Sequence, residues 1–368
     1  MKTVYDGFSP LENIPHSDTC FIGANTGRGF LTLSEPLSEE GLARLYIIKG
    51  GAGTGKSSLM KKAAEGAVKR GIPVTAFLCG SDPDSFDAVV LGGKIGITDG
   101  TFPHVREMKY PAAVSSIVDL SRFLDGDKLS ERRGEIAALS EKKTSLYRAA
   151  YSYLKATETV ESERMAALRD AVEWEKLRAW AARTAKALCG REVRRGLNGT
   201  PRKSTFYTSS ITMKGAVSLP AFERKANTVW GVQDSFGIAH LLLRALGDAC
   251  MARGLSAEYG LIPVGDRIKE VYFPEIRTLF SAAPSSPVVK TVNAARFLQK
   301  DWVKASGGRM RFTGKCMDAM LGEAVSLLAQ AGEAHFALER INMDAMDFDA
   351  LREYSDGVVG EIMAAFEN

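Results

Sequence analysis

The sequence predicts an α/β fold arranged as two similar halves, and three observations lead to this prediction. Short apolar runs of the buried-strand kind alternate with stretches at helical spacing, which is typical of a parallel sheet with helices on both faces. The chain has 368 residues, a length that suits two domains better than one. Segments of the first half also recur in order in the second half. We therefore expect two domains, over residues 1–200 and 201–368.

A glycine-rich loop is the most informative stretch of the chain. The segment LYIIKGGAGTGKSSL, which begins at Leu45, contains the pattern G-x-x-x-x-G-K-[ST] without a mismatch. An apolar strand precedes the loop, and a stretch at helical spacing follows it and ends at Gly71. This is the context that the phosphate-binding P-loop requires, because its glycines let backbone amides wrap a phosphate chain closely. Each half is accordingly expected to be a P-loop NTPase-like three-layer domain.

The residues of the loop have expected roles in binding ATP and Mg²⁺. The following helix directs its N-terminal amides and positive dipole end at the phosphates. Lys56 is expected to reach the β- and γ-phosphates and to act in catalysis, while the Ser57 hydroxyl binds Mg²⁺. The predicted nucleotide-binding residues are Gly50, Gly51, Ala52, Gly53, Thr54, Gly55, Lys56, Ser57 and Ser58.

Other elements of the first half follow from apolar patterning. Two short strands or a hairpin are expected from Phe21, and further strands at VTAFL, from Val74, and at KIGITD, which ends at Asp99. Residues 115–190 are rich in Ala, Glu, Lys, Arg and Leu and contain no proline. They predict a helical hairpin or small bundle that is added to the first domain.

Several polar residues lie where they could take part in catalysis. Asp99 follows an apolar strand, so its carboxylate is expected beside the loop, near Mg²⁺; the alternative is an ordinary turn residue. Asp82 and Asp84, together with Asp87, follow the second strand. They could polarise the attacking water or hold a phosphate acceptor, or they could simply cap turns and helices. His104 could sense the γ-phosphate or hydrogen-bond Asp99, or it could be a surface residue.

The second half keeps the hydrophobic framework of the first but loses its polar groups. When the halves are aligned, Gly237 falls within the loop, but His240 takes the place of the lysine. Leu241 replaces the Mg²⁺-binding hydroxyl, and Ala282 replaces the strand-end aspartate. A structural or regulatory half without nucleotide is the simplest interpretation, so one active site is expected.

The composition of the chain indicates where in the cell the protein is located and which classes of partner it is expected to bind. The net charge is +4 and charged residues make up 25% of the chain, which is ordinary for a soluble protein. The basic segment Arg191–Lys203 lacks interleaved aromatics and is interpreted as a linker rather than a nucleic-acid contact. Five dispersed cysteines favour free thiols in a reducing compartment. No apolar stretch approaches the ~20 residues that span a bilayer, so we expect a cytoplasmic protein without a membrane partner.

Five motifs together resemble a known family. They are FIGANTGRGF, YIIKGGAGTGKSSLMKK, CGSDPDSFD, ITDGTFPHV and AAYSYLKA. With them the chain resembles an uncharacterised family of bacterial ATP-binding proteins with two P-loop-like halves, seen mainly in spore-forming and related Gram-positive bacteria. The resemblance implies a nucleotide-binding ATPase and supplies no substrate. Family members often keep a P-loop in the second half, and this chain does not.

Three classes of function remain open from the sequence. The first is an ATPase with one active site whose motion drives an unidentified protein partner. The second is a small-molecule or nucleotide kinase, with the acidic loop after the second strand holding the acceptor. The third is a nucleotide-dependent binding or regulatory module with little turnover. Hydrolysis is expected to be slow without a partner, because no catalytic base or arginine finger is evident.

Overall fold

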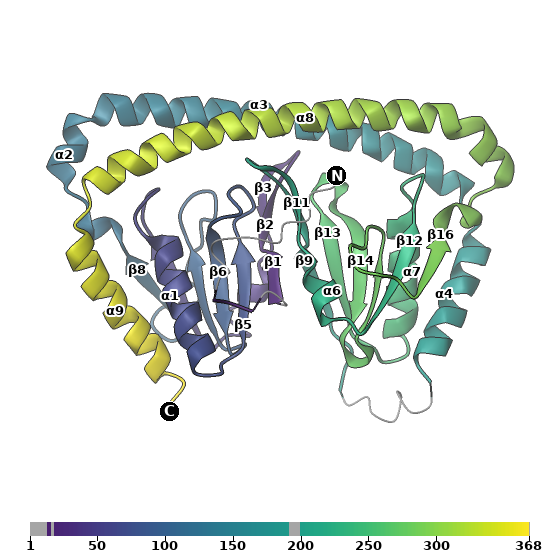
Figure 1. The fold of residues 1–368 in the computed structure, drawn as a ribbon, viewed down its shortest axis with the longest axis horizontal. Helices are drawn as coiled ribbons and strands as arrows, with labels where there is room; N and C mark the ends of the chain where they lie inside the picture. Colours follow the sequence, from purple (N-terminus) through teal and green to yellow (C-terminus); the bar gives the residue numbers. More distant parts are fainter. Residues whose placement is uncertain (1–12, 16–17, 191–198, 368) are drawn as a thin grey trace.

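One mixed β-sheet runs through the whole molecule (Figure 1). The computed structural model describes residues 13–15, 18–190 and 199–367, so most of the expected linker, Arg191–Lys203, lies outside the described residues. The sheet has 12 strands, in the order β16-β12-β15-β14-β13-β9-β1-β5-β6-β7-β4-β8. The strands are β1 (Thr19–Phe21), β4 (Arg44–Lys49), β5 (Val74–Leu78), β6 (Phe86–Leu91), β7 (Ile95–Asp99), β8 (Ser115–Asp119), β9 (Lys203–Tyr207), β12 (Thr228–Gln233), β13 (Ala257–Ile262), β14 (Arg267–Phe273), β15 (Thr278–Ser281) and β16 (Lys290–Asn293).

The two halves of the sheet have the same strand order. From the centre outward, the first half reads β1-β5-β6-β7-β4-β8 and the second reads β9-β13-β14-β15-β12-β16. The parallel and antiparallel pairings also correspond, strand by strand. The halves join where β1 and β9 pair antiparallel, with Phe21 opposite Tyr207. The order of recurring segments in the sequence is thus matched by a repeated topology.

The prediction of parallel sheets is correct for only part of each half. Strand β6 runs antiparallel to both β5 and β7, whereas β4 is parallel to β7 and β8. The cause is local: Gly92 and Gly93 connect β6 to β7 with φ of 58° and 66°. Two consecutive residues with positive φ form the tight turn that favours a β-hairpin, which leaves no room for a crossover helix.

Helices cover mainly one face of the sheet, which differs from the expected cover on both faces. Side chains of β4 alternate between the faces. Tyr46 and Ile48 pack with the helices, whereas Leu45 and Ile47 belong to a separate cluster on the opposite face. The helices on the first face are α1 (Lys56–Lys69), α4 (Trp174–Leu188), α7 (Ala239–Met251) and α9 (Phe348–Ala364). In the described residues the opposite face is packed by loops and by the short helices η3 (Glu35–Leu37) and α6 (Ala221–Lys225).

Two long helices cross from one half to the other. Helix α3 (Arg133–Ala171) and helix α8 (Lys300–Asp344) pack along each other and cross over one end of the strands, at the top of Figure 1. Helix α3 leaves the first half and leads to α4, which packs on α7 of the second half. Helix α8 leaves the second half and leads to α9, which packs on α1 of the first. The helical part expected within 115–190 therefore starts with strand β8 and ends on the second half.

Two hairpins tie the halves together near the centre. They are β2–β3 (Gly23–Thr26 and Gly29–Thr32) and β10–β11 (Ser209–Thr212 and Gly215–Ser218). At the tip of the first hairpin, Arg28 pairs with Asp266 of the second half, and at the tip of the other, Lys214 pairs with Asp84 of the first. The remaining short helices are α2 (Gly126–Glu131), η4 (Ser121–Phe123), η5 (Val264–Asp266), η6 (Pro274–Ile276) and η7 (Ala294–Phe297).

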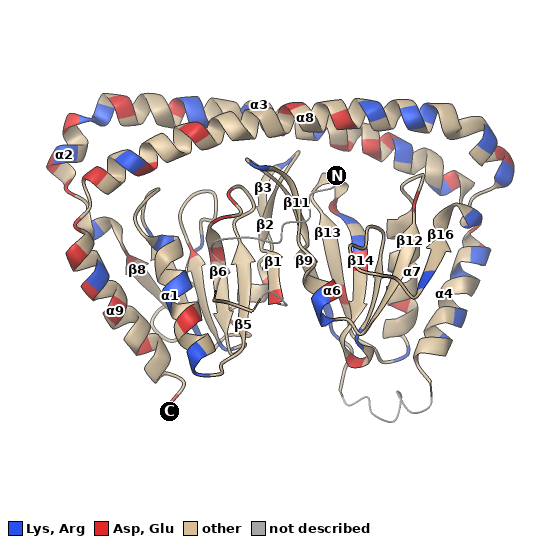
Figure 2. Cartoon of the chain, viewed as in Figure 1, with Lys and Arg blue, Asp and Glu red and all other residues tan. Residues whose placement is uncertain are grey.

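Charges of both signs mix along α3 and α8 and form no continuous basic stripe in the view of Figure 2. Among the described helices, none combines the length and the apolar character needed to cross a membrane. All five cysteines lie within the described residues, and all are free.

Candidate functional site

The glycine-rich loop lies between β4 and the first turn of α1. Gly53 and Gly55 adopt φ of 74° and 83°, the left-handed region that favours glycine. A Cβ atom at Gly53 would lie 2.8 Å from the carbonyl oxygen of Glu339, so a larger residue there would require the neighbouring helix to move. Helix α1 begins at Lys56, which directs its free N-terminal amides toward the loop.

Lys56 begins α1, and it lies beside Asp99, the last residue of β7. The Lys56 ammonium donates to the carbonyl oxygens of Gly50 and Gly51 at 2.7 and 2.6 Å. It also lies 3.7 Å from Oδ2 of Asp99. The other carboxylate oxygen of Asp99 accepts a hydrogen bond from the Thr101 amide at 2.7 Å, as a turn residue does. Asp99 therefore makes the turn contact and also faces the lysine.

The other predicted loop residues surround the start of α1. The Ser57 hydroxyl accepts a hydrogen bond from the Phe86 amide at 3.1 Å, which places the beginning of β6 beside it. The Thr54 hydroxyl donates to the Gly51 carbonyl at 2.9 Å and is buried, whereas Ser58 is exposed. Ser57 and Asp99 supply the hard oxygen ligands that Mg²⁺ prefers. Whether these residues bind nucleotide and Mg²⁺ stays a prediction.

Helix α8 covers this loop, a contact that the sequence analysis missed. Asn342 donates from Nδ2 to the carbonyl oxygen of Ala52 at 2.7 Å, across 290 positions of the chain. The Glu339 carboxyl group also lies close to the amide of Gly53, which acts to lower its pKa. Burial and the charge of Asp82 raise the pKa of Glu339, while the Gly53 amide and Lys56 act in the opposite direction. An internal carboxylate thus occupies an amide that was expected to face phosphate.

Two further basic groups lie above the loop. His335, one turn before Glu339 on α8, places Nε2 3.7 Å from Oε1 of that carboxylate. Burial, together with the charges of Lys143 and Lys56, lowers the pKa of His335 to about 4. Burial and the charge of Lys56 also lower the pKa of Lys143 on α3. Lys56 and Lys143 therefore bring positive charge to the loop, as binding of a polyphosphate would require, beside the carboxyl groups of Glu339 and Asp99.

The two carboxylates Asp82 and Asp84, in the acidic loop after β5, have different neighbours. The Asp82 carboxylate accepts hydrogen bonds from the Asp84 amide at 3.3 Å and the Ser85 hydroxyl at 3.1 Å, and burial raises its pKa. It also lies close enough to Glu339 to raise the pKa of that carboxyl. Asp84 instead pairs with Lys214. Of the two predicted catalytic carboxylates in this acidic segment, Asp82 alone lies toward the glycine-rich loop, and its hydrogen bonds are those of a turn residue.

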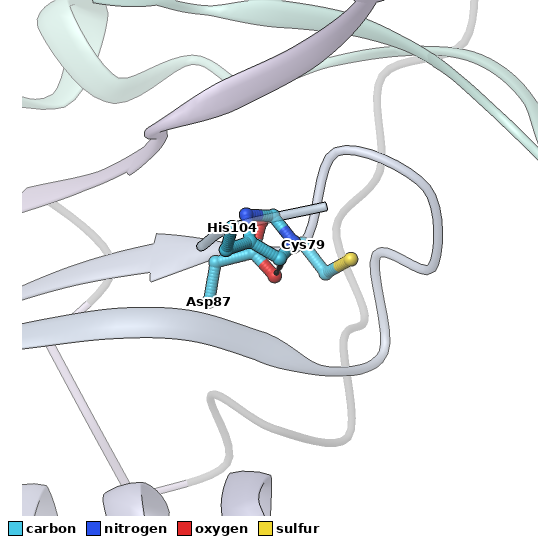
Figure 3. Close-up of side chains that lie close together, drawn as sticks. All are labelled: Cys79, Asp87 and His104. Carbon is cyan, nitrogen blue, oxygen red and sulfur yellow. Dashed lines mark ion pairs between the residues drawn. The ribbon is translucent and has the colours of Figure 1, made fainter. Parts of the chain in front are cut away.

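One buried and two partly buried side chains gather at the ends of β5, β6 and β7 (Figure 3). They are Cys79, which follows β5, Asp87 on β6 and His104, and their candidate ligand atoms all lie within 4.8 Å of one another. His104 Nε2 is 3.3 Å from Oδ1 of Asp87, so this histidine pairs with Asp87 rather than with Asp99. Burial raises the pKa of Asp87 against the effect of His104, and burial together with Asp87 raises the pKa of Cys79.

A cavity of about 660 Å³ extends outward from Asp99 and His104. Its walls come from β2–β3, from η3 and from the segment 103–109. Phe30, Glu39 and Arg106 are among the residues that line it. The cavity is large enough for a small-molecule ligand, and it carries groups of both charges.

The loop of the second half is closed by its own aspartate. One oxygen of the Asp234 carboxylate accepts hydrogen bonds from the amides of Phe236, Gly237 and Ile238 at 3.3, 2.7 and 3.0 Å. The other oxygen accepts from the amide of Ala239 at 2.8 Å. Helix α7 begins at Ala239, so this carboxylate occupies the place where a helix N-terminus would bind an anion.

Comparison of the chain with protein-family models, curated proteins and solved structures finds no match.

Proposed function

We propose that this protein is an ATP- and Mg²⁺-binding P-loop NTPase with one nucleotide site, in its first half. In this proposal the two halves are tandem P-loop NTPase-like units, and the second has lost its site. The observation that carries the proposal is the combination of left-handed Gly53 and Gly55, the start of α1 at Lys56, and the contact of Lys56 with Asp99 at 3.7 Å. Loop amides, a lysine and a strand-end carboxylate are the set that cradles Mg²⁺-triphosphate.

Lys56 and Glu339 are the groups that must rearrange when phosphate binds. The Lys56 ammonium, which now donates to two loop carbonyls, would turn to the β- and γ-phosphates. Glu339, which lies close to the Gly53 amide, would leave because a carboxylate and a phosphate repel each other. Bound Mg²⁺ would neutralise phosphate charge, with Ser57 and Asp99 as its protein ligands.

The contact between the glycine-rich loop and α8 favours, among the candidate functions, an ATPase whose motion acts on a protein partner. Asn342 and Glu339 belong to the helix that packs along α3 and connects the two halves. A displacement of α8 at the loop is therefore transmitted to the α3–α8 pair, whose outer surface is available to a protein partner.

The second candidate function is a small-molecule kinase. The cavity of about 660 Å³ opens directly at Asp99, so an acceptor bound there would lie next to the expected γ-phosphate. Transfer of labelled γ-phosphate to a cell-extract metabolite pool, with no release of free phosphate, would favour this alternative. Release of free phosphate would favour the ATPase.

Lys56→Ala with a matched His240→Ala control tests the nucleotide site. Hydrogen bonds to a charged group contribute about 1.5–3 kcal/mol, so we expect Lys56→Ala to weaken ATP binding by about 10- to 100-fold. His240 takes the lysine's place in the second half, and its replacement is expected to leave the affinity unchanged. Calorimetric titration with ATP–Mg²⁺ measures both. If the wild type binds no ATP, or if Lys56→Ala binds and releases phosphate as the wild type does, the proposed site is wrong.

A further inference from the structure

The three side chains beside the loop form a cluster with mixed ligand chemistry. Cys79, Asp87 and His104 offer a sulfur, an oxygen and a nitrogen within 4.8 Å of one another (Figure 3). Asp87 is 3% exposed, and the His104 side chain is 10% exposed. They come from three separate segments, after β5, on β6 and after β7, so local sequence patterning does not explain why they meet.

We propose that Cys79, Asp87 and His104 bind one zinc ion. A thiolate, an imidazole and a carboxylate are the ligand types of Zn²⁺, and three protein ligands with an open fourth position are typical of zinc sites that act on a bound molecule. Mg²⁺ and Ca²⁺ prefer oxygen ligands, so this site is chemically distinct from the expected Mg²⁺ site at Ser57 and Asp99. The proposal does not depend on nucleotide binding.

The surroundings of the sulfur and the imidazole support this assignment independently of the ligand spacing. The Cys79 sulfur accepts hydrogen bonds from the amides of Ser81 and Asp82 at 3.5 and 3.4 Å. Such amide–sulfur bonds favour the thiolate and orient it, as outer-shell partners of metal ligands do. Within the part of the chain that the structure describes, His104 Nδ1 is buried without a hydrogen-bond partner. A buried nitrogen that lacks a partner requires an explanation, and a metal ion or an atom bound to one would provide it.

The electrostatics of the cluster also favour a cation. Asp87 is a buried carboxylate whose nearest basic partner in the described residues is His104, at 3.3 Å. A thiol lies against the same carboxylate and would oppose it if it ionised. Zn²⁺ bound to the deprotonated thiol and carboxyl would compensate the two negative charges that burial otherwise disfavours.

The cluster is accessible and belongs only to the first half. The cavity of about 660 Å³ reaches His104, which provides an entry path and room for water or a substrate as the fourth ligand. The corresponding segments of the second half, 262–266 and 282–290, contain neither cysteine nor histidine. The proposed zinc ligands therefore occur together with the intact glycine-rich loop, and not in the half that has lost it.

Metal loading of the full-length protein tests the proposal. We expect purified protein, dialysed against Zn²⁺ and then against metal-free buffer, to retain one equivalent by elemental analysis. Co²⁺ in place of zinc is expected to give a thiolate-to-cobalt charge-transfer band that Cys79→Ser abolishes. Cys316→Ser, which removes a thiol of α8 outside the cluster, is the matched control and keeps the band. Asp87→Asn and His104→Gln are expected to weaken metal binding more than about tenfold.

Two further measurements complete this test, one on a Lys56 variant and one by alkylation of Cys79. Lys56→Ala is expected to bind zinc as the wild type does, so failure of the nucleotide site and failure of the metal site are distinguishable. If the Cys79 variant does not fold, as judged by circular dichroism, alkylation of wild-type protein replaces it: Zn²⁺ should slow modification of Cys79 at least tenfold relative to Cys316. Wild type that retains no zinc, a cobalt band that persists in folded Cys79→Ser, or unchanged alkylation of Cys79 would each overturn the assignment.

Discussion

The two halves place a glycine-containing loop at the same point of the fold, between β4 and α1 in the first and between β12 and α7 in the second. Gly53 and Gly237 are left-handed in both, with φ of 74° and 94°. In the first loop Lys56 folds over the backbone, and α8 touches it through Glu339 and Asn342. In the second, four amides donate to the carboxylate of a single residue of the loop itself.

In the second loop this backbone holds an internal anion, the Asp234 carboxylate, whereas the proposed function gives the first loop an external one. Amides at a helix N-terminus are unsatisfied and attract negative charge. In the second half the Asp234 carboxylate supplies that charge permanently. Loss of the lysine there therefore leaves none of these four amides without a hydrogen-bond acceptor. Helix α3 also joins the second half through ion pairs. The Glu161 carboxylate lies 2.5 Å from Arg267 on β14 and 3.4 Å from Arg164 on the same helix. The first loop lacks such a built-in aspartate, and its partner Glu339 comes from a separate helix.

Replacement of Asp99 should have the largest effect and tests whether the first half alone is active. Loss of a metal-ligating carboxylate removes several kcal/mol of transition-state stabilisation, so Asp99→Asn is expected to slow phosphate release at least about 100-fold. Asp119 ends β8 on the other side of β4, and its carboxylate accepts from the Ser121 amide at 2.9 Å. Asp119→Asn is therefore the control and should leave the rate unchanged. Equal loss in both variants would indicate a general effect of strand-end aspartates.

Replacement of Asp234 tests the internal anion of the second half. Asp234→Ala leaves four amides without their acceptor and is expected to lower the free energy of unfolding by about 1–3 kcal/mol. Asp234→Asn keeps one carbonyl oxygen and should cost less. Urea unfolding measures both effects, and added sulfate should restore stability to the alanine variant more than to the wild type, since an external anion can fill the vacated place. Stability unchanged in the alanine variant would contradict this account of the second loop.

Replacement of Glu339 tests whether α8 competes with phosphate in the first half. Removal of a carboxyl group that competes with phosphate for the Gly53 amide is expected to favour ATP binding by about 0.5–1.5 kcal/mol, so Glu339→Gln should tighten affinity about 2- to 10-fold. Glu333 is exposed on the same helix, and Glu333→Gln serves as the control for a general change of charge. Weaker ATP binding by Glu339→Gln would show that this carboxylate supports the site instead.

The smallest effect concerns two histidines, one near each loop. The pKa of both His240 and His335 is lowered from 6.5 to about 4, mainly by burial. In the unfolded chain they titrate near 6.5, so between pH 6.5 and 4 the unfolded state binds more protons and stability falls as the pH falls. The double variant His240→Gln/His335→Gln should lose less stability over this window, measured by urea unfolding at a series of pH values. Parallel curves for both proteins would show that these histidines do not titrate as described.

Much of the candidate site follows from short stretches of sequence. The pattern around Lys56 predicts a strand, a loop and a helix, and β4 and α1 lie there. Asp99 lies beside Lys56 because strands β4 and β7 are parallel neighbours, and the carboxyl ends of such strands meet. The antiparallel β6 was missed although Gly92 and Gly93 signal a hairpin. Asp234 also carried a usable signal, since aspartate commonly accepts from amides a few residues on.

The sequence by itself determined the left-handed loop, the strand and helix around it, and the loss of its polar groups in the second half. These features follow from backbone sterics, apolar periodicity and residue identity, all of which act over a few positions. Only the tertiary structure decided that Glu339 covers the loop, that His104 meets Asp87 and Cys79, and that α4 and α9 pack on the opposite halves. Those contacts depend on where two long helices cross and how distant strands pair, and non-local packing sets both.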